Sequence, residues 1–133
     1  MIRDALYNSQ GVRSFLYREW DNNLECCTIL MHYPSTADSE NDDPTIRQCI
    51  SICKNNGYGS IKVYNVASQD NYALYQYEPY ILVAWGAKLT RRESNRLISY
   101  LTERHNILCF SKLKDSRPGL PTRLPLNTVI QEY

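Results

Sequence analysis

One stretch in the first third of the chain constrains the fold more than any other. Residues 26–33 form an almost uninterrupted apolar run of strand length, and Pro34 ends it abruptly. A polar, acidic loop follows, and Asp43-Pro44 then marks a helix start, because aspartate is a good N-cap and proline suits the first helical position. This order predicts a strand–loop–helix unit of an open α/β sheet, in which ligands bind where the loop leaves the strand.

The rest of the chain repeats this alternation. Four more segments have the composition of strands, at residues 12–20, 60–66, 80–86 and 107–110. Apolar residues recur at helical spacing between Pro44 and Gly57, and again after a capping box formed by Thr90 and Glu93. We therefore expect an α/β fold of three layers (α/β/α) with a mostly parallel, four-stranded central sheet made of residues 26–33, 60–66, 80–86 and 107–110.

The length of 133 residues predicts a single domain, residues 1–133, in which the basic, proline-interrupted segment 111–133 wraps the surface as a tail. Fifteen Lys and Arg nearly balance fourteen Asp and Glu, so no overall field draws the chain to nucleic acid or to a membrane. No apolar run approaches the roughly 20 residues that span a bilayer. These features favour a cytoplasmic protein with no membrane partner.

Five cysteines lie in apolar segments, which suits reduced thiols better than disulfides. Cys49 and Cys53 are one helical turn apart and could both reach one metal ion. A closed site needs four ligands, however, and no others are evident, so core packing is the better interpretation. We expect no metal site and no cofactor.

Several blocks of sequence, in order, resemble a bacterial and phage family of domains of unknown function. Residues 34–38 read Pro-Ser-Thr-Ala-Asp and residues 42–45 read Asp-Asp-Pro-Thr, close to that family's hallmark N-P-S-T-A-D…D-D-P-T. The resemblance covers roughly residues 13–126. The other matching blocks are Arg18-x-Trp20, Gly57-Tyr58-Gly59, Val63-x-Asn65 and Ala84-Trp85-Gly86.

This layout in turn looks like that of the uracil-DNA glycosylases, as a distant relative. The resemblance implies a pocket for a nucleobase, nucleotide or nucleic acid at the carboxyl ends of the strands of a bacterial or phage protein, and hydrolysis of an N-glycosidic bond. It also implies that the residue before Pro34 positions water, that Asn65 reads the base and that a late histidine stabilises the departing base. In this chain Tyr33 precedes the proline and Leu124 stands where the histidine is expected.

These two departures bear on the chemistry. A phenol, whose ordinary pKa is about 10, is a poor general base at neutral pH. Tyr33 and Asp38 are our candidate catalytic residues, and Asp38 is the better candidate for activating water. An Asx-turn that stabilises the loop is an equally supported role for Asp38, and a helix cap is the better interpretation of Asp43.

The candidate ligand-binding residues lie in the loop after the apolar run, at the ends of two further strands and in the basic tail. They are Pro34, Ser35, Thr36, Asp42, Thr45, Arg47, Asn65, Trp85 and Arg123. Structural alternatives stand beside them: Arg47 would pair with Asp43, and Trp85 would belong to the core. A lone histidine inside a strand, such as His32, is more often a buried residue with satisfied hydrogen bonds than a catalyst.

Three functions fit these observations. The first is a glycosylase-like domain that binds a nucleobase, nucleotide or nucleic acid. The second is a degenerate phage protein that sequesters a nucleotide signal without chemistry. The third is a protein-interaction module that presents the tyrosine-rich segment 72–80, whose rings would otherwise stack on bases or close the core.

Overall fold

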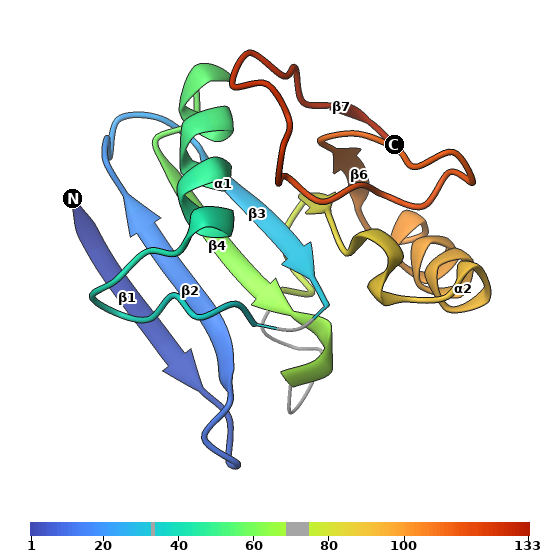
Figure 1. The fold of residues 1–133 in the computed structure, drawn as a ribbon, viewed down its shortest axis with the longest axis horizontal. Coiled ribbons are helices and arrows are strands. Elements are labelled where there is room, and N and C mark those ends of the chain that lie inside the picture. Colours follow the sequence, from blue (N-terminus) through green and yellow to red (C-terminus); the bar gives the residue numbers. More distant parts are fainter. Residues whose placement is uncertain (33, 69–74) are drawn as a thin grey trace.

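A mixed β-sheet forms the centre of the molecule in the computed structural model, which describes residues 1–32, 34–68 and 75–133 (Figure 1). The described strands are β1 (Ile2–Tyr7), β2 (Arg13–Glu19), β3 (Cys26–Met31), β4 (Ser60–Asn65), β5 (Tyr80–Val83), β6 (Asn106–Cys109) and β7 (Gln131–Glu132). Their order across the sheet is β1-β2-β4-β3-β5-β6-β7. The predicted catalytic Tyr33, together with Tyr72 of the tyrosine-rich segment, lies outside the described residues.

The prediction of a mostly parallel, four-stranded sheet in a three-layer α/β/α fold is wrong. The described sheet has seven strands, and antiparallel pairs join β1 to β2, β2 to β4 and β6 to β7. Parallel pairs join β4 to β3, β3 to β5 and β5 to β6. The connections at residues 8–12 and 20–25 are too short for the crossover of a dozen or more residues that parallel neighbours need, so they reverse the chain.

Strands β1 and β7 had no clear signal in the sequence. Strand β1 lies at the edge of the sheet and is exposed along most of its length, so it lacks the apolar alternation of a half-buried strand. Strand β7 has two residues, too few for any pattern.

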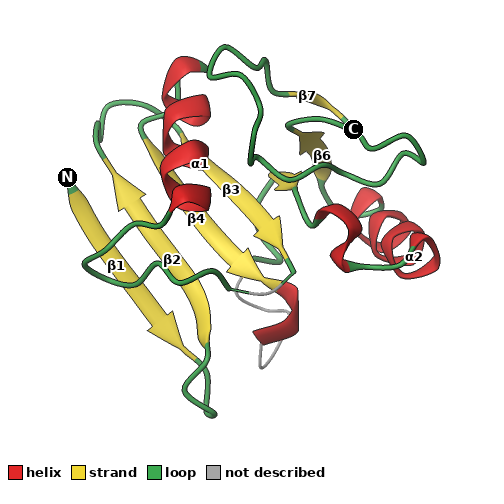
Figure 2. Cartoon of the chain, in the orientation of Figure 1, coloured by secondary structure: helices red, strands yellow, loops and turns green. Residues whose placement is uncertain are grey.

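Two α-helices cover the sheet in the described part of the chain, α1 (Pro44–Asn55) and α2 (Arg91–Thr102) (Figure 2). Both predicted helix starts are confirmed. The Asp43 side chain caps α1 by accepting from the Ile46 N–H at 2.8 Å, and Thr90 forms the capping box of α2 with Glu93. Two short 3-10 turns, η1 (Val66–Ser68) and η3 (Gly86–Lys88), follow β4 and β5.

The two helices lie on opposite faces of the sheet. Ile29 of β3 belongs to the core under α1, whereas its neighbour Leu30 packs in a second core with Leu101 of α2. Successive strand residues point to opposite faces, so the near-continuous apolar run in β3 reflects burial on both sides. This explains why β3 is the strongest strand signal in the sequence.

Cys49 and Cys53 pack in the core under α1, as predicted, and both are fully buried. Burial raises the pKa of the Cys49 thiol, and contact with Cys27 together with burial raises that of Cys53. Within the described residues, no group of three or more His, Cys, Asp or Glu side chains could hold a metal ion. No helix among them is long and apolar enough to cross a bilayer.

The C-terminal segment crosses from β6 to α1 and returns to the sheet as β7 (Figure 1). Side chains of α1 bind its backbone, since the Gln48 amide donates to the Leu124 carbonyl and Asn55 donates to that of Leu126. Leu120 and Leu124 pack against the core under α1. The segment therefore lies beside the turn that follows β5, where it forms one side of the pocket described next.

Candidate functional site

A pocket of about 280 Å³ lies at the carboxyl ends of the parallel neighbours β3 and β5. Four of the predicted ligand-binding residues line it together: Pro34, Ser35, Thr45 and Trp85. They come from the loop after β3, the first turn of α1 and the end of β5. The loop therefore does form the wall of a pocket at the end of the sheet where such folds bind ligands.

Four further lining residues had not been predicted as part of the site: Met31, His32, Lys88 and Leu120. His32 follows β3 directly, and its Nδ1 atom is buried without a hydrogen-bond partner among the described residues, contrary to the prediction of a satisfied histidine. Lys88 is exposed and follows the Trp85-Gly86 block. Leu120 comes from the C-terminal segment, and nothing in the sequence connects it with a loop more than eighty residues earlier.

The Ser35 hydroxyl lies beside the Asp43 carboxylate and contributes to lowering its pKa. Within the described residues, however, Ser35 Oγ is buried and has no partner that meets hydrogen-bond geometry. The wall of the pocket thus carries two buried polar atoms, His32 Nδ1 and Ser35 Oγ, available to a ligand. Each can donate or accept, depending on the tautomer of the imidazole and the rotation of the hydroxyl.

Two arginines of β2 donate hydrogen bonds to the loop between β3 and α1. Arg18 is completely buried, and its Nε donates to Asp42 Oδ1 at 2.6 Å. Its Nη2 donates to the carbonyl oxygens of Asp38 and Asn41, and Arg13 donates to the carbonyl of Ala37. The guanidinium groups therefore fix the loop backbone by donating to three of its carbonyl oxygens.

These contacts place Asp42 and Arg47 outside the pocket. The Asp42 carboxylate pairs with Arg18 and lies 3.8 Å from Arg3. The Arg47 guanidinium is exposed and donates to the Asp42 carbonyl at 3.1 Å, rather than to the side chain of Asp43. Both residues stabilise the loop in this arrangement.

Asp38 also interacts with its own loop. Its Oδ1 accepts from the backbone N–H groups of Glu40 at 2.9 Å and Asn41 at 2.7 Å, and the Asn41 amide reaches both carboxylate oxygens. The backbone hydrogen bonds lower the pKa of Asp38, which makes it a weaker base. Asp38 does not line the pocket, so the geometry matches the Asx-turn alternative.

Three other predicted residues, Asn65, Arg123 and Thr36, do not line the pocket. Asn65 is fully buried at the end of β4, beside Met31 in the sheet register, and Arg123 is exposed in the C-terminal segment. Thr36 is exposed, with its hydroxyl 3.5 Å from Asp43. Trp85 lines the pocket but is fully buried, and its Nε1 donates to Ser94 of α2 at 2.8 Å, as expected of a core residue.

The lowered pKa of Asp43 predicts how the stability of the protein changes at acidic pH. Burial raises the pKa of Asp43, but the neighbouring Ser35 hydroxyl and hydrogen bonds from the Ile46 and Ala37 N–H groups lower it by more, so the net shift is downward. A lowered native pKa confers stability that is complete above the unfolded-state value of about 3.9 and is lost as the pH falls through the native value.

Asparagine is an equally good N-cap that does not titrate, but its NH2 group cannot accept from the Ala37 N–H as Oδ2 of Asp43 does, so Asp43→Asn is expected to lower stability at neutral pH by about 1–3 kcal/mol. Urea unfolding between neutral pH and about pH 3 should show a shallower loss of stability for the variant than for the wild type. Parallel curves would mean that the Asp43 carboxylate is not stabilised in the native state.

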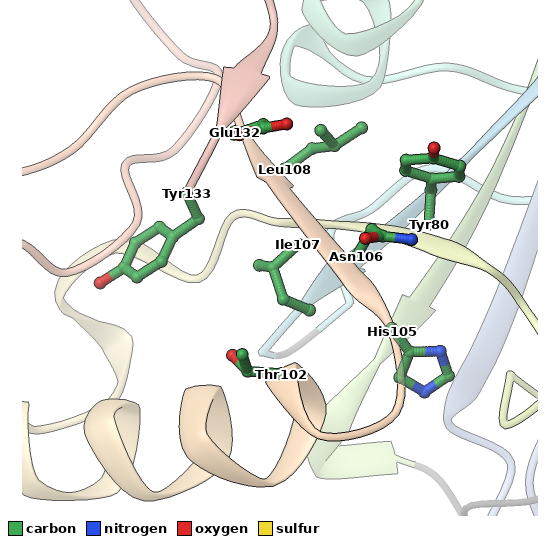
Figure 3. Close-up of a pocket in the computed structure, with 8 residues that line it drawn as sticks. All are labelled: Tyr80, Thr102, His105, Asn106, Ile107, Leu108, Glu132 and Tyr133. Carbon is green, nitrogen blue, oxygen red and sulfur yellow. The ribbon is translucent and has the colours of Figure 1, made fainter.

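A separate pocket, of about 380 Å³, lies at the opposite, amino ends of β5 and β6 (Figure 3). Figure 3 shows Tyr80, His105 and Tyr133 around it. His105 Nδ1 contacts the Glu78 carbonyl, and the Thr102 hydroxyl donates to the Ile98 carbonyl at 2.7 Å. These two polar atoms thus already have partners, and the pocket lies away from the loop that follows β3.

The predicted tyrosine-rich segment is only partly described. Tyr75 is buried and packs against Tyr64, with ring centroids 5.4 Å apart, which makes it a core residue. Tyr77 and Tyr80 are exposed. The hypothesis of an interaction module stays a prediction, because residues 69–74 lie outside the described part of the chain.

Fold and pocket together define a mixed-sheet α/β domain with a small pocket at the carboxyl ends of its central parallel strands. A family model described as a protein of unknown function (DUF1643) matches residues 13–80, slightly more than half of the chain, and the chain belongs to that family. The match starts where the predicted resemblance starts and ends before residue 126. No curated protein and no solved structure matches the chain.

Proposed function

We propose that this domain binds a nucleobase or nucleotide in the pocket at the carboxyl ends of β3 and β5, in the cytoplasm of a bacterial host. The observation that supports the proposal most is the buried Nδ1 of His32, which has no hydrogen-bond partner among the described residues. A buried polar atom without a partner destabilises a protein by about 1–3 kcal/mol. A ligand that bonds to this atom recovers that free energy.

The lining of the pocket suits this class of ligand. Met31, Pro34 and Leu120 offer apolar surface for a flat ring, while His32 and Ser35 offer polar atoms for its edge. Nucleobase edges present both donors and acceptors, which these two side chains can match. Lys88 at the pocket forms no ion pair within the described residues and suits a phosphate.

Binding without turnover is the better supported form of the proposal. A glycosylase mechanism needs a group that activates water at the pocket, and the candidate Asp38 hydrogen-bonds to its own loop away from it. The likeness to uracil-DNA glycosylases supports the same ligand class, and the sequestering of a nucleotide signal requires only the pocket. We expect no base release from oligonucleotides; release that Asp38→Ala abolishes would establish the hydrolase instead.

A thermal-shift screen against nucleobases, nucleosides and nucleoside monophosphates tests the ligand class directly. A ligand that binds only the folded protein at a hundred times its dissociation constant adds about 2.7 kcal/mol of stability, which raises the unfolding temperature measurably. We expect at least one member of the panel to do so. No shift with any nucleobase, nucleoside or nucleotide would contradict the proposed function.

The two histidines of the chain provide a matched pair of variants. His32→Phe keeps a ring of similar size and removes the unpaired Nδ1, so we expect undiminished stability without ligand and about ten-fold weaker binding of the ligand found in the screen. His105→Phe removes an Nδ1 that contacts the Glu78 carbonyl, so it should lower stability and leave binding unchanged. The reverse pattern would contradict the assignment of the pocket.

A further inference from the structure

The proposed site, called the first pocket below, adjoins a second pocket of about 330 Å³. The second pocket is lined by residues of the turn after β5 and of the C-terminal segment, among them Gly86, Leu113, Thr122 and Leu124. Every lining side chain is uncharged, and most of the lining is aliphatic. Leu124, which occupies the position where the glycosylase-like pattern expects a histidine, is one of its walls.

One side chain, that of Leu120, lines both pockets and separates them. It lies directly over Gly86, where an added Cβ would be only 2.7 Å from Leu120 Cγ. The Gly86 N–H donates to the Pro118 carbonyl at 2.8 Å, which holds the C-terminal segment against this turn. The close approach and the positive φ of 60° both require glycine here. The two pockets therefore lie side by side, with the Leu120 side chain between them.

The polar and charged groups are distributed unevenly over the two pockets. The first pocket offers His32 and Ser35, the second offers only neutral groups, and Lys88 lies on the turn between β5 and α2 that borders both. Lys88 is exposed and forms no ion pair within the described part of the chain. A ligand that spans both pockets would thus have neutral ends and an anionic centre.

We propose that the ligand is a dinucleotide, with one base in each pocket and the connecting phosphodiester at Lys88. This inference rests on the proposed function and adds to it the size and charge pattern of the ligand. A mononucleotide would use the first pocket and Lys88 and leave the second pocket to water. Burial of the second base in the neutral pocket is expected to give a dinucleotide about ten-fold higher affinity.

Calorimetric titration with nucleosides, nucleoside 5′-monophosphates and dinucleoside monophosphates of all base combinations tests this proposal. The best dinucleoside monophosphate should bind about ten-fold more tightly than the best mononucleotide. Thr122→Trp places a large side chain in the second pocket from an exposed position. This variant should abolish the advantage of the dinucleotide and leave the affinity for the mononucleotide unchanged, with Thr122→Ser as the control. Lys88→Met should weaken both phosphate-bearing ligands and spare the nucleoside.

The possible outcomes separate the two proposals. Equal affinities for mononucleotides and dinucleotides, or a Thr122→Trp variant that keeps the advantage of the dinucleotide, would overturn the two-pocket inference and leave the proposed function intact. Binding of none of these ligands would overturn both. Unfolding midpoints of the variants, measured without ligand, show whether each variant is folded before its affinities are compared.

Discussion

Replacement of Arg18 by methionine is expected to lower the free energy of unfolding by about 3–5 kcal/mol, because the largely buried Asp42 carboxylate loses its close cation and keeps only the weaker contact with the exposed Arg3, 3.8 Å away. Arg18 is fully buried, and it donates to the Asp42 carboxylate and to the carbonyl oxygens of Asp38 and Asn41. Methionine fills much of the same volume and provides none of these donors. Urea unfolding monitored by circular dichroism measures the loss.

The matched control is Arg47→Met, in the same region of the chain. Arg47 is exposed, and among the described residues its guanidinium reaches only the Asp42 carbonyl, at 3.1 Å, so the substitution should change stability by less than about 0.5 kcal/mol. Similar losses of unfolding free energy for the two variants would mean that the hydrogen bonds of Arg18 do not stabilise the loop. Since the loop forms the wall of the pocket, Arg18→Met should also weaken ligand binding more than Arg47→Met does.

Trp85 is the second position with a large expected effect. Its side chain is fully buried in the core under α2, so Trp85→Ala should destabilise the protein by about 3–5 kcal/mol through the cavity that it leaves. Trp85→Phe keeps most of the ring but removes the hydrogen bond to Ser94, whose buried hydroxyl then lacks its donor. We expect a loss of about 1–3 kcal/mol for this variant.

The same variants distinguish a core residue from a stacking wall. If Trp85 belongs to the core, Trp85→Phe lowers the unfolding midpoint and changes ligand affinity by less than about two-fold. A variant with unchanged stability and strongly reduced affinity would show that the ring stacks on the ligand. Trp20→Phe is the control for loss of an indole hydrogen bond, because Trp20 is only partly buried and donates to the Tyr58 carbonyl at 2.9 Å.

The sequence allowed the local elements to be predicted well, because their signals are local. The cap at Asp43 and the capping box at Thr90 each involve residues within one helical turn, and β3 is buried on both faces, which its composition shows. The direction of the strands was predicted incorrectly because strand-like composition does not show whether a neighbour is parallel. The length of residues 20–25 contains that information, since so short a connection reverses the chain.

The candidate site was predictable where it is formed by one segment and not where distant segments meet. Pro34 and Ser35 line the pocket from the loop that follows β3, and Thr45 lines it from the first turn of α1, where that loop ends. Leu120 lines it through a packing contact with Gly86, which no local pattern predicts. Asp38 and Asp42 carry carboxylates of the kind that react or bind ligands. In the structure, however, Asp42 pairs with Arg18, and Asp38 accepts hydrogen bonds from the backbone of its own loop.

The most direct test of the proposed function is to map the site by NMR. An equimolar mixture of the four ribonucleoside 5′-monophosphates is titrated into isotopically labelled protein, and the amide shifts are followed. The account predicts saturable shifts at His32, Ser35, Thr45 and Lys88, with none at His105 and Asn106 in the pocket at the amino ends of the strands. Shifts confined to that other pocket, or no saturable shifts at all, would contradict it.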